Sequence, residues 1–247
     1  MIYTFWSVNG GVGKTTLSVA IAYNIAKRNK NKKVLLIDYN LVNPDTDMHI
    51  KIQPTDMKEL YRYIVSKSLN ESILTTYIRE HDKLSNFFVL SGLYDINYFD
   101  KLTVKDFTLI IELAKKMGYD YIFLDIDSSV HIDATFVALT NADKVFVVTD
   151  GMYHSIRNTN RYITDILSKI SIDDDNIEII VNKFDREVSH KEEVRRLLGR
   201  LDSHFIEFNK EVMRFVNKGI PFVECKEKKA KTLISSINEL TDYMTKL

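Results

Sequence analysis

One short segment of the chain combines glycines, a lysine and threonines in a spacing that suits phosphate binding. It consists of Asn9, Gly10, Gly11, Val12, Gly13, Lys14, Thr15 and Thr16. The apolar run Ile2–Val8 precedes it and a helical pattern follows, so its backbone N–H groups can surround phosphate oxygens at a helix N-terminus. Lys14 can reach the β- and γ-phosphates, and the Thr15 hydroxyl can coordinate Mg²⁺. Although Val8 replaces the first glycine of the pattern GxxxxGK[ST], the segment predicts binding of ATP or ADP with Mg²⁺.

Two aspartates end apolar runs and are candidates for the metal side of this site. Asp125 closes Tyr121–Leu124, where it could hold a magnesium-bound water, and Asp38 closes Val34–Ile37 in the same way. Ligands of open α/β sheets bind at the carboxyl ends of the strands, which is where both carboxylates would lie. The alternative is that each is a cap or turn residue after its strand. Thr15, Asp38 and Asp125 are therefore the predicted Mg²⁺ residues, partly through water.

The elements that would position these residues alternate between buried strands and amphipathic helices. The strand candidates are Ile2–Val8, Val34–Ile37, Phe87–Leu90, Tyr121–Leu124, Lys144–Val148 and Ile177–Val181. The helix candidates are Thr15–Lys27, Thr103–Met117, Ile156–Ser171 and Lys191–Leu198. This alternation predicts an α/β fold with a doubly wound, mainly parallel sheet flanked by helices. Leu41–Asn86 contains no clear strand and is expected to be a surface excursion with one or two helices.

Length and composition limit the class of protein. The chain has 247 residues, only 3 prolines and no linker-like segment, which predicts a single nucleotide-binding domain over residues 1–247. Lysine plus arginine equal aspartate plus glutamate at 34 each, which disfavours a general nucleic-acid coat. The single cysteine, Cys225, and the lack of a signal-like or membrane-spanning segment lead us to expect a soluble cytoplasmic protein. The 6 histidines show no metal-ligand spacing.

The order of the motifs resembles the MinD/ParA family of P-loop ATPases over nearly the whole chain. The matching segments are NGGVGKTT, KKVLLIDYNLVNPD, YDYIFLDIDSS with ADKVFVVTD, IIVNKFD, and KGIPFVE before a C-terminal helix. The segment NFFVLSGLYD, the following helix and GYDYIFLDID are most similar to the pilus-localisation branch called CpaE or TadZ, as is the Ser155–Arg161 stretch after Asp150.

This resemblance implies a homodimer closed around ATP and assigns roles to further residues. Asn182 corresponds to the asparagine that reads the adenine ring, unless it only forms a turn after its strand. The neighbouring Lys183 is carried over as a second nucleotide contact. Lys14 and Asp38 are the candidate catalytic residues of the family's hydrolysis reaction.

Two positions depart from the family pattern. Asn9 stands where the family's signature lysine reaches the partner's nucleotide, and Asn40 stands where an aspartate orients the attacking water. An amide cannot accept a proton from water, and a missing cation at the phosphoryl group costs orders of magnitude in rate. We therefore predict nucleotide binding with slow or absent hydrolysis, which leaves the enzyme status open. Alternative sources of the missing groups are Asp45, Asp47 and Asp127 for the carboxylate and Lys183 and Arg157 for the cation.

Several features bear on partners. Basic residues at 27–33, at 226–231 and at Arg195, Arg196 and Arg200 are read first as solvated surface, with DNA binding as an alternative that the neutral net charge disfavours. The apolar stripe from Ala230 to Leu247 predicts a helix packed on the domain's own sheet, without direct membrane insertion.

The favoured function is a dimeric, nucleotide-controlled switch that positions or recruits a larger assembly such as a pilus or secretion apparatus. Such a protein would be cytoplasmic and recruited to a pole or a membrane-associated complex. The competing functions are a DNA-partition ATPase, a metabolic P-loop ligase, and a pseudo-enzyme scaffold that dimerises without nucleotide.

Overall fold

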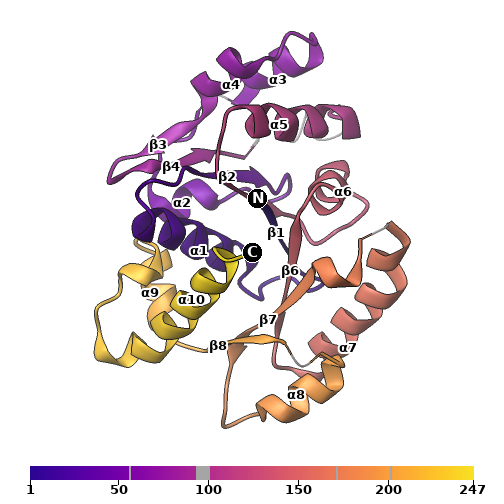
Figure 1. Ribbon diagram of the computed structural model, residues 1–247, viewed down its shortest axis with the longest axis vertical. Helices are drawn as coiled ribbons and strands as arrows, with labels where there is room; N and C mark the ends of the chain where they lie inside the picture. Colours follow the sequence, from indigo (N-terminus) through magenta and orange to yellow (C-terminus); the bar gives the residue numbers. More distant parts are fainter. Residues whose placement is uncertain (56, 93–100, 171, 201) are drawn as a thin grey trace.

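A computed structural model describes residues 1–55, 57–92, 101–170, 172–200 and 202–247 of the chain. Eight strands form one sheet in the order β3-β4-β2-β5-β1-β6-β7-β8 (Figure 1). The strands are β1 (Ile2–Trp6), β2 (Val34–Tyr39), β3 (Arg79–His81), β4 (Leu84–Leu90), β5 (Tyr121–Ile126), β6 (Lys144–Asp150), β7 (Ile177–Phe184) and β8 (His204–Glu207). Every strand pair is parallel except β3 with β4, which confirms the predicted doubly wound, mainly parallel architecture.

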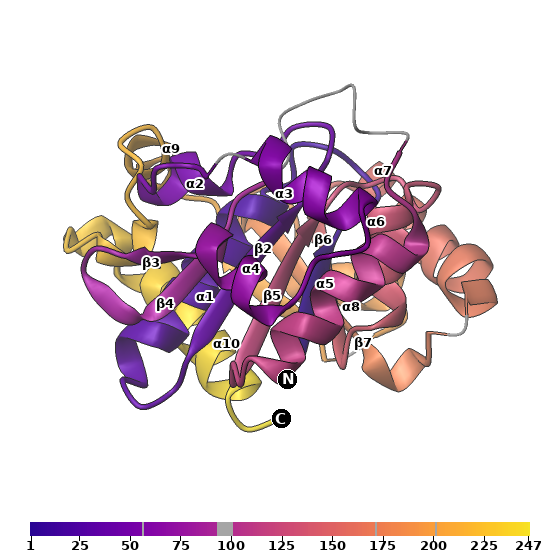
Figure 2. The ribbon, with the colours of Figure 1, turned by 90° about the horizontal axis from the view of Figure 1, so that it is seen from above.

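Helices cover both faces of this sheet. They are α1 (Lys14–Arg28), α2 (Thr46–Ile50), α3 (Met57–Val65), α4 (Glu71–Tyr77), α5 (Val104–Lys116), α6 (Asp133–Thr140), α7 (Tyr153–Tyr162), α8 (Lys191–Leu198), α9 (Glu211–Val216) and α10 (Lys231–Met244). Figure 2 shows α5 and α6 together on one side of the strands and α1 with α10 on the other. The sheet is therefore the middle layer of three.

The two sheet faces bury separate apolar cores, as the alternation of side chains along each strand requires. Along β1, Tyr3 and Phe5 point toward α1 and α10, whereas Ile2 and Trp6 point toward α5, α6 and α7. All four are fully or almost fully buried, which is why the strand reads as a continuous apolar run. The Tyr3 hydroxyl donates a hydrogen bond of 2.5 Å to the Met244 carbonyl oxygen, joining the first strand to the last helix.

The predicted strands and helices are found, and the structure adds α6 and α9, which the prediction does not contain. The described residues between 41 and 86 form three helices, the short edge strand β3 and the start of β4, where one or two helices and no strand are predicted. The predicted helix Ile156–Ser171 begins earlier, at Tyr153, and after Tyr162 continues as a π-type turn and a 3₁₀ turn to Ile170. Strand β8 is absent from the prediction, because four residues give too short an apolar pattern. Ser171 and residues 93–100, which include the end of the NFFVLSGLYD motif, lie outside the described residues.

The sheet brings the two predicted aspartates together at its carboxyl edge. β2 and β5 are neighbours, and their register pairs Asp38 directly with Asp125. β1 lies on the other side of β5, so the loop that follows Trp6 emerges beside both carboxylates. The loop after β1 and the ends of β2 and β5, which are far apart in the sequence, therefore lie together at one edge of the sheet.

Candidate nucleotide-binding site

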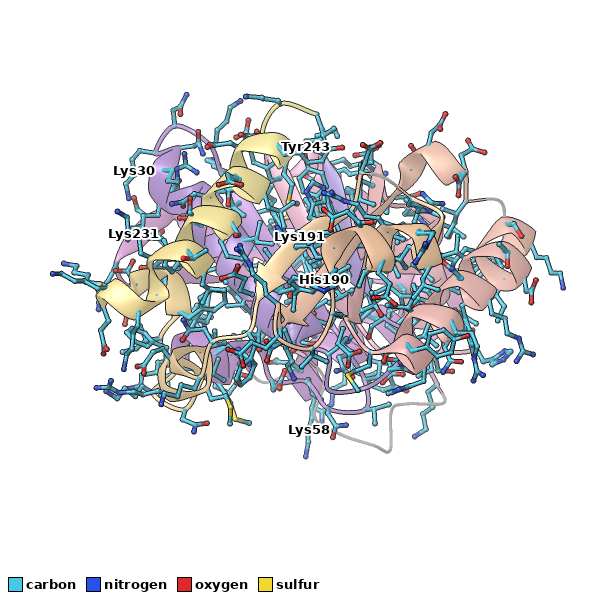
Figure 3. All side chains as sticks on the ribbon, turned by 90° about the horizontal axis from the view of Figure 1, so that it is seen from below. Lys30, Lys58, His190, Lys191, Lys231 and Tyr243 are labelled. Carbon is cyan, nitrogen blue, oxygen red and sulfur yellow. The ribbon has the colours of Figure 1, made fainter. Side chains whose placement is uncertain are left out.

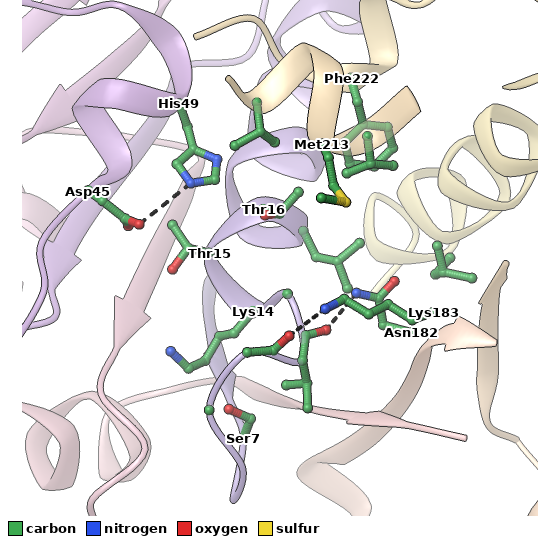
Figure 4. Close-up of a pocket in the computed structure, with 18 of the residues that line it drawn as sticks. Ser7, Lys14, Thr15, Thr16, Asp45, His49, Asn182, Lys183, Met213 and Phe222 are labelled. Carbon is green, nitrogen blue, oxygen red and sulfur yellow. Dashed lines mark hydrogen bonds and ion pairs between the residues drawn. The ribbon is translucent and has the colours of Figure 1, made fainter. Parts of the chain in front are cut away.

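A cavity of about 500 Å³ opens at this carboxyl edge (Figure 4). Its walls come from the loop after β1, the segment after β2, the end of β7, and β8 with α9. The predicted residues that line it are Gly10, Gly11, Val12, Gly13, Lys14, Thr15, Thr16, Asn182 and Lys183. Asn9, Asp38 and Asp125 are not part of its wall. Both aspartates are buried, and Asp125 lies behind Thr15. The volume lies within the range of about 300–1,000 Å³ that is usual for small-molecule sites.

The loop between β1 and α1 has the backbone that its glycines predict. Gly11 and Gly13 adopt positive φ angles of 74° and 91°, in the left-handed region that side-chain-bearing residues avoid. A Cβ atom on Gly13 would also lie 2.5 Å from the Asn182 Nδ2 atom. Gly13 is the residue before α1, so the loop delivers its backbone N–H groups to the N-terminus of a 15-residue helix. This is a cradle shaped for an anion.

The end of β7 holds the loop in this shape. The Asn182 side chain donates a buried hydrogen bond of 2.7 Å from Nδ2 to the Val12 carbonyl oxygen. The Lys183 ammonium donates one of 2.5 Å to the Gly11 carbonyl oxygen, and Lys183 itself has a positive φ of 52° (Figure 4). For the predicted adenine-reading role, Asn182 keeps its Oδ1 atom and one Nδ2–H, because the other Nδ2–H is engaged with the loop.

Thr15 is connected to the buried carboxylate of Asp125. Its hydroxyl donates a 2.7 Å hydrogen bond to Asp125 Oδ2, and the Ser18 hydroxyl donates one of 2.9 Å to Oδ1. Burial raises the pKa of Asp125, while the charge of Lys14 and these two hydrogen bonds act in the opposite direction. Ser18 is missing from the predicted site, although its position three residues after Thr15 on α1 places both on one helix face.

Asp38 accepts hydrogen bonds from the segment that follows it. The donors are the backbone N–H groups of Asn40 at 3.0 Å, Asp45 at 3.0 Å and Thr46 at 3.1 Å, and the Thr46 hydroxyl at 2.9 Å. Burial, followed by the charge of Asp125, nevertheless raises the pKa of Asp38 to about 8. Asp38 thus fixes the conformation of the segment after β2.

The predicted magnesium residues Thr15, Asp38 and Asp125 provide negative charge and a hydroxyl oxygen that a divalent cation would satisfy. Two buried carboxylates in register repel each other, and a divalent cation beside Thr15 would offset that repulsion. Among the described residues, no three histidine, cysteine, aspartate or glutamate side chains could hold a metal ion by themselves. Mg²⁺ usually takes one or two protein ligands together with substrate phosphates and waters, so Thr15 with nucleotide phosphates would suffice.

Some of the residues considered as substitutes for Asn9 and Asn40 line the cavity and others do not. Asp45, Asp127 and Lys183 line the cavity. Asp47 and Arg157 do not: Asp47 is buried in α2, and Arg157 is exposed on α7. Asn40 lines the cavity, but its Oδ1 atom accepts hydrogen bonds from the backbone N–H groups of Val42 at 3.2 Å and Asn43 at 3.0 Å. Asn40 therefore shapes its own turn.

The basic stretches are partly neutralised by acidic neighbours. Lys27 pairs with Glu224, Arg28 with Asp242 and Lys32 with Asp120, at 2.7, 2.6 and 2.8 Å. In the second stretch Lys229 lies 2.6 Å from Glu211 and 3.1 Å from Glu227. Figure 3 shows Lys30 and Lys231, which remain without such a bond in the part of the chain described, on one flank beside α1 and α10.

The C-terminal stripe forms α10 and packs inside the molecule, as predicted. Leu233, Ile237, Leu240 and Met244 are buried in the core shared with α1. Asn24 of α1 donates hydrogen bonds to Asn238 at 2.9 Å and Thr241 at 3.0 Å. Within the ranges that the structure covers, no helix is both long and apolar enough to cross a membrane.

A glycine loop between a central parallel strand and a helix, with a threonine bonded to the aspartate of the neighbouring strand, is the arrangement of the P-loop NTPase fold. A protein-family model with the description "AAA domain" matches residues 2–179, and the chain belongs to that family. The relatives and structural neighbours to which the chain is similar are MinD and ParA-type proteins.

Two curated relatives illustrate the similarity. The septum site-determining protein MinD of Escherichia coli (strain K12) is 26% identical over 163 residues, which are 66% of this chain and 57% of that protein. The chain thus spans little more than half the length of several of the curated relatives that it matches. MinD of Helicobacter pylori is 26% identical over an alignment covering 99% of this chain and 93% of that protein.

Solved structures share the fold at low sequence identity. A ParA family ATPase from Chlorobium tepidum has a TM-score of 0.83 at 19% identity, covering 97% of this chain and 98% of its own. MinD from Pyrococcus horikoshii, solved with Mg-ADP, has a TM-score of 0.77 at 19% identity and covers 97% and 96%. At these identities the likeness is one of fold.

Proposed function

We propose that this protein is an ATP-dependent switch: it binds ATP with Mg²⁺ in the cavity at the carboxyl edge, hydrolyses it slowly or not at all, and in the ATP-bound form recruits or positions a larger assembly. The observation that carries this proposal is the phosphate loop, which is already held in shape by Asn182 and Lys183. A preorganised site binds without an ordering cost at the moment of binding.

Slow hydrolysis is supported by the two departures from the family pattern. The Asn40 side-chain oxygen is engaged with the backbone of its own turn, so it is not free to orient water. Asn9 has no charge to place against a developing phosphoryl charge, and such charges contribute about 10³–10⁵ in rate where they have been measured. Bound ATP would therefore persist, which suits a switch better than a metabolic enzyme.

Exposed apolar side chains at the rim of the cavity favour a homodimer that closes over the nucleotide. Phe208 and Met213 line the cavity and are also exposed. Met152 and Val188 are exposed in the segments after β6 and β7, and Tyr153 is exposed at the start of α7. Apolar surface gathered at one edge marks an interaction site more often than scattered apolar residues do. A second copy facing this edge would bury these residues and the nucleotide together.

The assembly that the dimer would recruit is inferred from relatives only. MinD of Aquifex aeolicus, with a TM-score of 0.76 and 23% identity, has been solved in a MinC:MinD cell division complex. The resemblance of the central segments to the CpaE/TadZ branch favours a pilus- or secretion-type assembly for this chain, and recruitment to a pole or a membrane-associated complex from the cytoplasm.

DNA partition is the second candidate function. A plasmid partition protein from Borrelia burgdorferi bound to AMPPNP shares the fold with a TM-score of 0.74 and 18% identity. DNA binding of this kind depends on basic residues that neutralise phosphates. Since the basic stretches around Lys27 and Lys229 are paired with carboxylates and the net charge is zero, the localisation switch is favoured.

The test measures oligomeric state and phosphate release together, without nucleotide, with ADP and with ATP. The variants are Lys14→Ala, which removes the phosphate contact, and Lys169→Ala, a matched exposed lysine outside the cavity. We expect wild type and Lys169→Ala to bind ATP and form a dimer with it, whereas Lys14→Ala remains monomeric.

Three outcomes would overturn the proposal. Failure of the wild-type protein to bind ATP would refute the central claim of the proposal. Turnover of about one per minute or faster, lost in Lys14→Ala, indicates an ordinary ATPase. A dimer that persists without nucleotide and in Lys14→Ala indicates a scaffold. Salt-dependent binding of arbitrary DNA in the presence of ATP would favour the partition function instead.

A further inference from the structure

Asn40 stands where the family has an aspartate, and the segment after β2 carries another carboxylate, Asp45, in the same cavity. Asp45 lines the cavity together with Asn40, Lys14 and Thr15. Asp45 follows Asn40 by five residues, so it is presented by the same turn that Asp38 fixes. The same wall of the cavity therefore holds both the amide that replaces the family aspartate and a second acidic side chain.

The Asp45 backbone is held on both sides. Its N–H group donates a 3.0 Å hydrogen bond to Asp38 Oδ2, and its carbonyl oxygen accepts bonds from the N–H groups of Met48 at 3.1 Å and His49 at 3.3 Å. These bonds fix the point from which the side chain leaves the backbone. A catalytic group has to be positioned in this way to contribute to a reaction.

The two side-chain oxygens of Asp45 have different surroundings. Oδ2 lies 3.7 Å from the Nε2 atom of His49, whose side chain is only 10% exposed (Figure 4). Oδ1 is buried and accepts no hydrogen bond from the described residues. A buried acceptor without a partner is costly, and such atoms usually serve a water or a ligand. The negative charge of Asp45 also acts on Asp125, which places it close to the Thr15 end of the cavity.

Resting on the proposed function, we propose that Asp45, positioned by His49, is the carboxylate that orients and deprotonates the attacking water in place of Asn40. The water oxygen forms a bond to the γ-phosphorus while the bond from that phosphorus to the β–γ bridging oxygen breaks. The electron pair of the broken bond stays with ADP. The water proton passes to the Asp45 carboxylate and then to the released inorganic phosphate.

Asp127 is the competing carboxylate, because it also lines the cavity. Its Oδ1 atom accepts a 2.8 Å hydrogen bond from the Ser129 N–H group, so it helps to shape the turn after β5. No histidine lies in an ion-pair contact with Asp127 among the residues described. Asp127→Asn therefore tests the competing assignment, since it and Asp45→Asn each remove one charge from the cavity wall and keep the side-chain size.

The experiment follows single-turnover conversion of bound ATP with Mg²⁺ present, and it measures the dissociation constant for ATP and the identity of the nucleotide recovered with the purified protein. Asp45→Asn should slow conversion about 100-fold, the lower end of what a positioned general base contributes, while the ATP dissociation constant changes less than about threefold. Its recovered nucleotide should shift from ADP toward ATP. His49→Gln should slow conversion less, again without a change in ATP affinity.

A rescue variant distinguishes chemistry from structural damage. Asn40→Asp combined with Asp45→Asn moves the carboxylate back to the family position and should restore conversion to at least the wild-type rate. Conversion by Asp45→Asn at the wild-type rate would refute the inference, as would selective loss in Asp127→Asn. Wild type that binds ATP but shows no conversion refutes this inference and leaves the switch intact, whereas wild type that does not bind ATP removes the switch as well.

Discussion

The phosphate loop and the segment after β2 form facing walls of one cavity, and they are stabilised in different ways. The loop is braced from outside, by Asn182 and Lys183 of β7 and by the link from Thr15 to Asp125. The β2 segment is organised around its own residues, through hydrogen bonds to Asp38 and Asn40. The loop matches the family pattern from Gly10 to Thr16, and the β2 segment departs from it at Asn40. Under the proposed function, nucleotide binding depends on Gly10–Thr16 of the loop, whereas hydrolysis depends on the β2 segment and on Asn9 at the start of the loop.

The largest expected effect is on the loop wall. Gly13→Ala forces a residue with a Cβ atom into a φ of 91°, which costs about 1–2 kcal/mol, and places that atom against Asn182. Nucleotide affinity should fall at least about 100-fold, since the loop must move to relieve the contact. Titration with a fluorescent ATP analogue measures this.

Gly10→Ala is the control for that variant. Gly10 lacks a positive φ, and a Cβ atom there meets nothing within 4 Å. Its thermal stability should remain that of wild type while Gly13→Ala melts at a lower temperature. Equal melting temperatures for Gly13→Ala and wild type would contradict the structural account of the loop.

The next largest effect is expected on the rate of ATP hydrolysis. Asn9→Lys restores the cation of the family pattern and should raise ATP turnover at least tenfold, with little change in ATP affinity. Phosphate release under saturating ATP measures it. An unchanged rate would mean that the missing lysine does not limit hydrolysis and that the β2 segment does.

A smaller effect is expected from weakening the brace on the loop. Asn182→Ala leaves the Val12 carbonyl oxygen without its buried partner, a loss of about 1–3 kcal/mol, or roughly tenfold or more in ATP affinity. Asn238→Ala removes an amide hydrogen bond to Asn24 on the far flank of α1 and should leave affinity unchanged. Equal effects of the two variants would show that Asn182 acts only through general stability.

The last prediction concerns the nucleotide-free fold and is a dependence of stability on pH that belongs to the β2 segment. The pKa of Asp38 is raised from 3.8 to about 8 in the nucleotide-free fold, so the folded state holds a proton there that the unfolded chain releases. The stability due to this proton is fully present below about pH 4 and is lost as the pH rises through about 8. Between pH 5 and pH 9 the melting temperature of wild type should fall relative to that of Asp38→Asn, whose amide does not titrate. A constant difference would contradict the raised pKa.

Much of this arrangement could be predicted from the sequence, because it depends on local pattern. The placement of Asp38 and Asp125 at adjacent strand ends follows from apolar runs that each stop at an aspartate. The braces could not be predicted, because the contact of Asn182 with Val12 joins residues 170 positions apart. Ser18 was missed for the same reason, because its hydroxyl bonds Asp125, 107 positions away. Thr46 was missed although it lies only eight positions from Asp38, because its bond depends on how the segment after β2 turns back.

The central position of β1 has a consequence for how the protein is made. The strand lies between β5 and β6, with Tyr3 opposite Phe123 on one side and Lys144 on the other. A ribosome adds about 5–20 residues per second, so the first strand to be synthesised waits on the order of ten seconds for both neighbours. During that time its buried side chains have no sheet to join, and the glycine loop behind it has no fixed shape. Nascent chains that have not yet reached β6 should therefore bind no nucleotide, and they are the natural clients of chaperones that shield apolar segments.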